Sequence, residues 1–164
     1  MYLNISERLM AEYDELTYKF EKGMPDHQDG LIIGKTIYLR PGQSATELAA
    51  TISEEIAHYL TSVGDITDSN NPDHRKQERR ARDIGAVMLV SPYDIIDCFE
   101  AGCVSIWECA EHLQVSEVTF KDAVKWYARK WNGIKTENNY TLLFQPNGTV
   151  AVLKSFNNFY EMGK

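Results

Sequence analysis

The chain has 164 residues, of which 43% are hydrophobic and 25% charged, and its formal net charge at pH 7 is −7. These ordinary globular values exclude a disordered or fibrous chain and argue against non-specific attraction to nucleic acid or anionic membranes. No stretch approaches the roughly 20 apolar residues of a membrane helix, and the N-terminus lacks a signal-peptide pattern, so we expect a cytoplasmic protein.

Residues 5–22 predict an amphipathic helix, because apolar side chains recur there at three- and four-residue intervals. A glycine and a proline soon after it are expected to end the helix. Two strand-like runs follow at residues 31–33 and 36–39. Gly34-Lys35 between them predicts a β-hairpin.

Ser44 and Glu47 form an S-x-x-E capping box and predict the start of a central helix, which Gly64 is expected to end. After a polar loop, a second helix is predicted over residues 73–90. One apolar arc of the central helix comprises Leu48, Ile52, Ile56, Tyr59, Leu60 and Val63. The side chains expected to face the other way are Thr46, Ala50, Ser53, Ala57 and Thr61.

The C-terminal part contains three more predicted helices, near residues 93–101, 105–113 and 116–130. Strand-like runs around Pro146-Asn147-Gly148 predict a second hairpin. The fold class is therefore α+β, with a helical core, a small antiparallel sheet, and C-terminal helices and hairpin. We expect one domain over residues 1–164, divided into a core of residues 1–92 and a helical and hairpin portion of residues 93–164.

The pentapeptide E-E-I-A-H, residues 54–58, is one residue away from the helical zinc signature H-E-x-x-H. Glu54 and His58 are one turn apart, so both can approach one ion, while Glu55 lies beside them at a different angle. All three border the apolar arc, where an unpaired carboxylate is unfavourable and a metal ion would satisfy it. Glu55 is then the candidate general base.

A catalytic zinc site needs a third protein ligand. In the second helix, Glu78 falls in line with Ala81, Gly85 and Met88, the small and apolar face that should meet the central helix. Glu78 is therefore the candidate third ligand. His74, one turn earlier, is the alternative.

Simpler interpretations exist for the same residues. The E-E-x-x-H stretch alone is compatible with a solvated helix border that carries one core histidine. Glu78 alone is compatible with an ion pair within its own helix, because Arg75 and Arg82 lie three residues before and four residues after it.

The sequence resembles the ImmA/IrrE metallopeptidases of phages and mobile elements, whose pattern is H-E-x-x-H followed by a helix with E-x-x-A. The matching stretches are AATISEEIAHYLTSVGDI and RKQERRAR, preceded by LIIGKTIYLRPG, over about residues 30–92. The resemblance implies metal ligands at Glu54, His58 and Glu78 and a catalytic Glu55. It further implies endopeptidase cleavage, in the cytoplasm, of a helix-turn-helix repressor encoded by the same element.

The chain departs from that pattern at the first ligand, where Glu54 replaces histidine, so it is similar to an E-E-x-x-H variant of the family. Two carboxylates and one imidazole make a harder and more anionic donor set than two imidazoles and a carboxylate. Zinc is the expected cofactor, with manganese, iron or another divalent ion as competitors.

Two other functions are compatible with the sequence. The stretch A-x-x-L-x-V-S, residues 110–116, has the spacing of a DNA-reading helix-turn-helix. However, Glu117 at the start of its second helix would repel phosphate, which argues against nucleic acid as a partner. The other function is that of an inactive descendant that binds the repressor without cutting it.

The three cysteines are Cys98, Cys103 and Cys109. Because their number is odd and no export signal precedes them, we expect reduced thiols. Their spacing matches no zinc pattern, so they are interpreted as small core residues.

Overall fold

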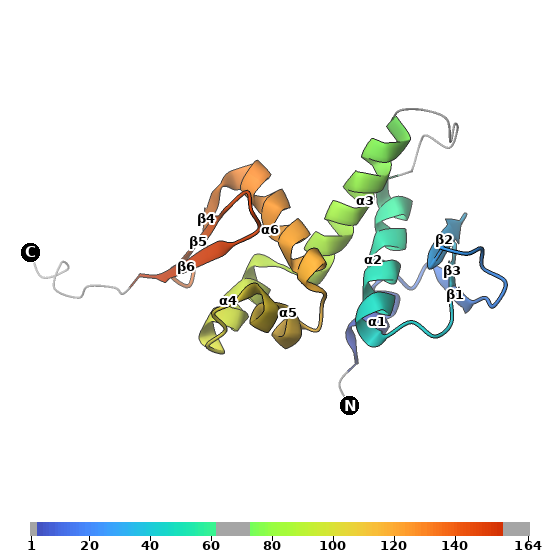
Figure 1. Ribbon diagram of the computed structural model, residues 1–164, viewed down its shortest axis with the longest axis horizontal. Helices are drawn as coiled ribbons and strands as arrows, with labels where there is room; N and C mark the ends of the chain where they lie inside the picture. Colours follow the sequence, from blue (N-terminus) through green and yellow to red (C-terminus); the bar gives the residue numbers. More distant parts are fainter. Residues whose placement is uncertain (1–2, 62–72, 156–164) are drawn as a thin grey trace, which may run out of the picture.

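The computed structural model of the protein describes residues 3–61 and 73–155 (Figure 1). Along the chain, a short first helix is followed by three strands and then by two long helices that pack together. Three further helices and a final three-stranded sheet complete the fold. The mixed arrangement confirms the predicted α+β class. None of the helices in these two ranges combines the length and hydropathy required to cross a membrane.

The first helix is shorter than predicted. α1 spans Ile5–Glu12, and Asn4 caps it by accepting the Glu7 N–H. β1, Thr17–Phe20, lies where the sequence predicted the rest of the helix. That part of the prediction was wrong because β1 pairs in parallel with β3, Thr36–Leu39, a tertiary contact that the local apolar spacing cannot reveal.

The predicted hairpin is confirmed. β2, Gly30–Ile33, runs antiparallel to β3, and Gly34 takes a left-handed backbone conformation with φ 60° in the turn. The strand order is β1-β3-β2, so the sheet is mixed rather than purely antiparallel, and β2 lies at one edge. Ile37 and Leu39 of β3 are fully buried in the core.

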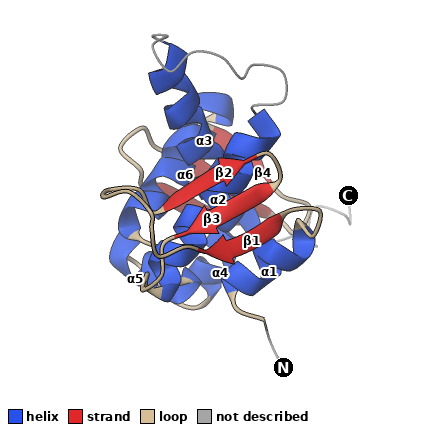
Figure 2. Cartoon of the chain, turned by 90° about the vertical axis from the view of Figure 1, so that its right-hand side faces the viewer, coloured by secondary structure: helices blue, strands red, loops and turns tan. Residues whose placement is uncertain are grey.

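Two helices form the centre of the protein: α2, Ala45–Thr61, and α3, Asp73–Leu89. The capping box is confirmed, since Ser44 Oγ accepts the Glu47 N–H at 3.2 Å and Glu47 accepts the Ser44 N–H at 3.0 Å. The first sheet lies over one side of α2 (Figure 2), and α3 packs against another. The helix stop expected at Gly64 and the loop after it lie outside the described residues.

Packing on two sides changes which residues of α2 are buried. Ser53 and Ala57, predicted to face away from the core, are 2% and 0% exposed because α3 covers them. Leu60, predicted in the apolar arc, is instead 46% exposed. The small side chains of α2 therefore form a second contact face, which packs against α3. A helical wheel based on hydrophobicity alone does not indicate this face.

The three C-terminal helices begin and end within one or two residues of their predicted bounds. The helices are α4, Pro92–Glu100, α5, Ile106–Leu113, and α6, Glu117–Trp131. The second sheet has the order β4-β5-β6 and consists of β4, Gly133–Lys135, β5, Tyr140–Phe144, and β6, Val150–Lys154. The hairpin β5–β6 is confirmed, whereas β4 was not predicted.

α6 packs against α3 and so joins the C-terminal elements to the central helices. Asp83 of α3 is 6% exposed and pairs with Arg129 of α6 at 2.8 Å. The Tyr127 hydroxyl donates to the Val90 carbonyl at 2.8 Å. One cluster of buried side chains extends from the first sheet through α2 and α3 to α6 and β5.

Candidate metal centre

The structure brings Glu54, His58 and Glu78 together between α2 and α3. One potential ligand atom from each lies within 4.8 Å of the others. His58 Nε2 lies 3.5 Å from Glu78 Oε2. All three side chains are partly buried, so an ion could reach them from solvent.

Close approach of the two helix backbones makes this meeting possible. Gly85 of α3 lies against α2, where an added Cβ would be 3.1 Å from the Glu54 nitrogen and 3.2 Å from its Cα. Because these are backbone atoms, a side chain at this position would require the two helix backbones to move apart by a few tenths of an ångström. Gly85 is two helical turns after Glu78 and therefore on the same face, so its missing side chain lets Glu78 reach the α2 residues.

A cavity of about 550 Å³ opens beside the three side chains. Its walls come from α2 and α3, from β2, and from the loop before β2. Glu55 lines this cavity together with Glu54, His58 and Glu78. The general-base candidate therefore faces the same space as the candidate ligands.

Gly30 brings β2 close to Glu55. A Cβ at this position would lie 2.5 Å from Thr51 Cγ2 and 3.0 Å from Glu55 Cγ. A side chain here would displace Thr51 and crowd Glu55, so glycine is the residue that leaves both in place. Gly30 was not among the residues selected from the sequence. Its position immediately before the predicted strand at residues 31–33 could have indicated a close backbone contact.

A family model described as the IrrE N-terminal-like domain, peptidase family M78, matches residues 7–125 of the chain. The chain belongs to this family. The match includes both central helices and the candidate metal centre, and it confirms the resemblance seen in the sequence.

Among solved structures, this M78 family member is similar to a Mycobacterium tuberculosis transcriptional regulator, with a TM-score of 0.57 and 12% sequence identity. The similarity covers 76% of this chain and 42% of the regulator, so the chain spans less than half of that protein. At this identity the comparison shows a shared fold. A search of curated protein sequences finds no match.

The electrostatics of the M78 site favour a cation. Burial raises the pKa of Glu54; the charges of Arg82 and His58 oppose this rise, and Glu78 adds to it. Several carboxylates therefore share a partly buried space. A bound divalent ion would remove this repulsion, and the donor set of two carboxylates and one imidazole fits such an ion, leaving a coordination position open.

Glu55 has the most perturbed carboxyl group of this site. Burial, with the charge of Glu54 second, raises its pKa to about 7, although a backbone hydrogen bond from Ile32 opposes the rise. A group with a pKa close to the working pH is an effective proton acceptor and donor. Glu55 can therefore exchange protons near neutrality.

His74 contacts Glu78 from within α3. Its Nε2 atom lies 3.9 Å from Glu78 Oε1, and its side chain is 51% exposed. In the described part of the chain, the basic side chains within 4.0 Å of the Glu78 carboxylate are those of His58 and His74. The intrahelical pair with Arg75 or Arg82, the simpler interpretation of Glu78, is not formed there.

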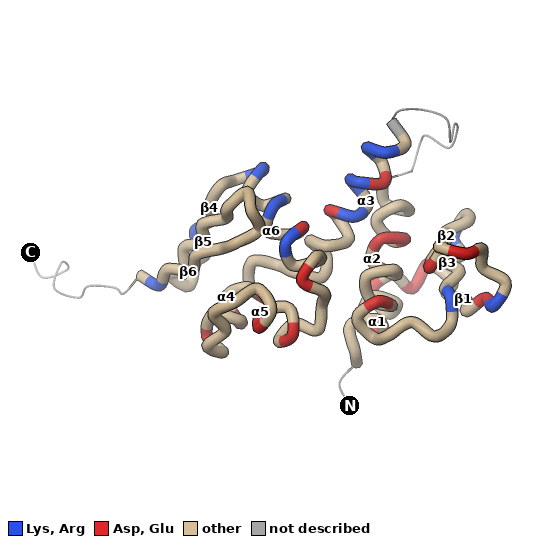
Figure 3. Tube along the Cα trace, in the orientation of Figure 1, with Lys and Arg blue, Asp and Glu red and all other residues tan. Residues whose placement is uncertain are grey.

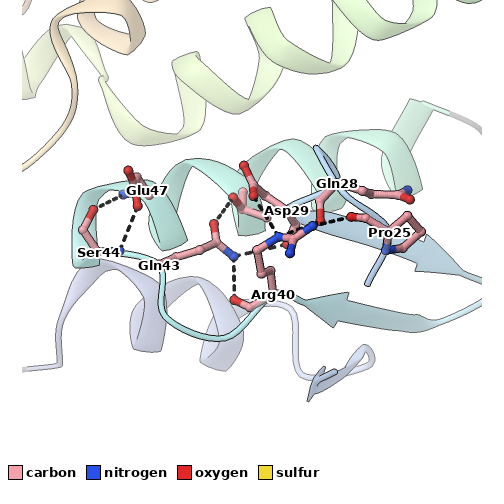
Figure 4. Close-up of polar contacts among 8 residues, drawn as sticks. Pro25, Gln28, Asp29, Arg40, Gln43, Ser44 and Glu47 are labelled. Atoms are coloured by element: carbon pink, nitrogen blue, oxygen red, sulfur yellow. Dashed lines mark hydrogen bonds and ion pairs between the residues drawn. The ribbon is translucent and has the colours of Figure 1, made fainter. Parts of the chain in front are cut away.

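Arg40 holds the loop that forms one rim of the cavity (Figure 4). Its guanidinium donates to the carbonyls of Pro25 and Gln28, the latter at 3.2 Å, and lies 3.4 Å from Asp29 Oδ1. The Gln43 amide donates to the Asp29 and Arg40 carbonyls at 3.2 and 2.9 Å. The loop is thus attached to β3 and to the start of α2.

Replacing Arg40 by glutamine should lower the free energy of unfolding by about 1–2 kcal/mol, because the loop carbonyls lose a charged donor. Urea unfolding measures this change. Arg8→Gln, at an exposed position of α1, is the matched control and should change stability by less than about 0.5 kcal/mol. Equal losses in both variants would contradict the role given to Arg40.

Proposed function

We propose that this protein is a metal-dependent endopeptidase of a phage or mobile element, and that its substrate is a helix-turn-helix repressor of the same element. One observation carries the catalytic part of the proposal: the ligand atoms of Glu54, His58 and Glu78 lie within 4.8 Å of one another, beside a third glutamate, Glu55, that lines the same cavity. Membership of the M78 peptidase family supports it.

Zinc is the proposed ion, held by Glu54, His58 and Glu78. Carboxylate oxygen and imidazole nitrogen are both zinc donors, and three protein ligands are typical of catalytic sites. A bound divalent ion supplies Lewis-acid polarisation of water and of a peptide carbonyl. Since the donor set contains two carboxylates, manganese or iron would compete more effectively than at a site with two histidines.

Glu55 is the proposed catalytic residue. Its carboxylate accepts a proton from the attacking water and then donates it to the departing amine, so it acts first as base and then as acid. The pKa of about 7, due mainly to burial, supports both steps near neutral pH. Gly30 acts as a positioning residue, because it leaves room for the Glu55 side chain.

An extended segment of the substrate is proposed to lie along β2. This strand is at the edge of its sheet and contributes Gly30, Leu31 and Ile32 to the cavity wall. Edge strands offer unpaired backbone donors and acceptors to an added peptide strand. Such pairing would hold the scissile bond near Glu55. The repressor as substrate rests on the family resemblance, and the cytoplasm is the proposed location.

The metal content of the purified protein tests the site. We expect His58→Ala and Glu78→Ala each to contain about one equivalent of divalent metal less than the wild type, since each change removes a ligand. Elemental analysis of protein purified without added metal is the measurement. His112→Ala and Glu117→Ala are matched controls at exposed positions and should retain the metal.

Full occupancy in His58→Ala would refute this metal site. Full occupancy in Glu78→Ala alone would instead make His74 the third ligand, which the double variant His74→Ala/Glu78→Ala would test. Metal-loaded protein that binds the repressor and leaves it intact would favour the inactive-descendant alternative.

The DNA-binding alternative has one feature in its favour, the short turn between α5 and α6. Ser116 caps α6 and Val115 is buried in the turn. However, the first turn of α6 presents Glu117 and the exposed Val118, which offer no donor to bases or phosphates. A sequence-specific, salt-dependent mobility shift of duplex DNA by the protein alone would favour this alternative.

A further inference from the structure

All three cysteines of the chain meet at one point, well separated in sequence from the centre between α2 and α3. Cys98 lies in α4, Cys103 in the turn that follows, and Cys109 in α5. Their sulfur atoms lie within 4.8 Å of one another, and all three are free thiols. The spacing along the chain gave no indication of this convergence.

Backbone contacts on both sides of the turn hold the thiols in this arrangement. The Cys103 N–H donates to the Cys98 carbonyl at 3.0 Å, and Gly102 has φ 84°, a left-handed conformation that favours glycine. On the other side, Glu108 accepts hydrogen bonds from the Val104 and Ser105 N–H groups at 2.6 and 3.1 Å. The cluster is thus fixed by the fold of the α4–α5 connection.

The thiols have only weak hydrogen-bond partners. Cys98 Sγ lies 3.8 Å from the Cys109 carbonyl oxygen, and Cys103 Sγ lies 3.7 Å from the Glu108 carbonyl oxygen. Thiols are poor donors, so little is lost when a cation replaces their protons. Burial raises the pKa of the Cys98 and Cys109 thiols, which keeps them protonated and unreactive while no cation is present.

A cavity of about 560 Å³ gives access to the cluster. All three cysteines line it, together with apolar side chains that include Phe120, Val150 and Val152. A small ion and a water molecule can enter this space. In apolar surroundings, three thiolates with a monovalent cation would leave two negative charges, whereas a divalent cation leaves only one, so the divalent ion is favoured.

We propose that Cys98, Cys103 and Cys109 form a second metal site, which binds zinc through three thiolates with a water molecule as the fourth ligand. Binding releases three thiol protons to solvent and forms three metal–sulfur bonds, which gives the complex a charge of −1. Zinc–sulfur bonds of about 2.3 Å require sulfur atoms roughly 3.8 Å apart. The sulfur atoms lie within 4.8 Å of one another, so each pair has to close by no more than about 1 Å to reach this separation.

Cadmium is the probe, because its thiolate complexes absorb in the ultraviolet and it shares the preference of zinc for sulfur. The titration uses full-length His58→Ala/Glu78→Ala, which lacks two ligands of the first centre. Since the chain has only three cysteines, any thiolate-to-cadmium band comes from this cluster. We expect saturation at one equivalent, displacement of bound zinc by cadmium, and protection of all three thiols from iodoacetamide.

Two further variants in the same background test the ligand set. Cys103→Ser and Cys109→Ser should each weaken cadmium binding by at least about tenfold, since loss of even an outer-shell partner has an effect of this size. Thr149→Val, which changes a cavity-lining residue without a thiol, should bind like the parent. Circular dichroism verifies that each variant is folded.

The absence of a band at stoichiometric cadmium would overturn the proposal, and so would unchanged affinity in either serine variant. Neither result depends on whether the centre between α2 and α3 binds metal, because the titrated protein already lacks His58 and Glu78. The outcome of this experiment is therefore separate from that of the proposed peptidase function.

Discussion

Replacement of Glu55 by glutamine should lower the kcat of repressor cleavage by roughly 10²–10⁴-fold, the range for loss of a general acid–base group. Glutamine has nearly the same size and can still accept the backbone hydrogen bond from Ile32, but it cannot take a proton from water. The metal content should stay at the wild-type level, because Glu55 is not among the three grouped ligand residues. Mass spectrometry of the repressor fragments and elemental analysis of the same preparation measure both quantities.

Glu117→Gln is the matched control, since Glu117 is exposed in the first turn of α6. Its kcat should equal that of the wild type. Loss of metal from Glu55→Gln would make Glu55 a ligand rather than a base. Cleavage at the wild-type rate would remove it from the mechanism altogether.

Replacement of Gly85 by alanine should lower the free energy of unfolding by about 1–3 kcal/mol, as overpacking of a tight contact does. At an open helical position the same substitution would raise stability by roughly 0.5–1 kcal/mol. The opposite sign is expected here because the new Cβ meets the backbone of Glu54 at 3.1–3.2 Å. Urea unfolding measures the change.

The same substitution should weaken metal binding by about tenfold or more, since it moves α3 and therefore Glu78 away from α2. Competition with a chelator of known affinity measures this effect. Arg80→Ala introduces alanine at an exposed position of α3. It is the control and should bind the metal with wild-type affinity. A stable Gly85→Ala protein with unchanged affinity would show that the helices can separate without loss of the site.

The sequence was sufficient to select the side chains of the candidate centre because their placement follows local rules. Glu54 and His58 are four residues apart on a helix, and Glu78 lies on a stripe of small residues that includes Gly85. A stripe of this kind must meet another helix, and α2 was the available partner. Residue spacing alone therefore predicts that the two carboxylates and the imidazole lie near one another.

Features that depend on contacts distant in sequence were not predictable in this way. The parallel pairing of Thr17 with Thr36 turns an apparently helical segment into β1. Arg40 reaches the carbonyl of Pro25 across a loop. The three cysteines meet across the connection between α4 and α5, where Gly102 has a left-handed backbone conformation. Each of these depends on chain geometry rather than on residue spacing.

Two of the proposed ligands belong to α2 and the third to α3, so an ion bound by all three would crosslink two helices. Its binding free energy would then contribute to the folded state, by about 1.4 kcal/mol for each tenfold rise of free ion above the dissociation constant. Scarcity of the ion would reduce both the fraction of metal-loaded protein and its resistance to unfolding. The supply of the metal would thus determine both the metal-loaded fraction of the protein and the lifetime of its folded state.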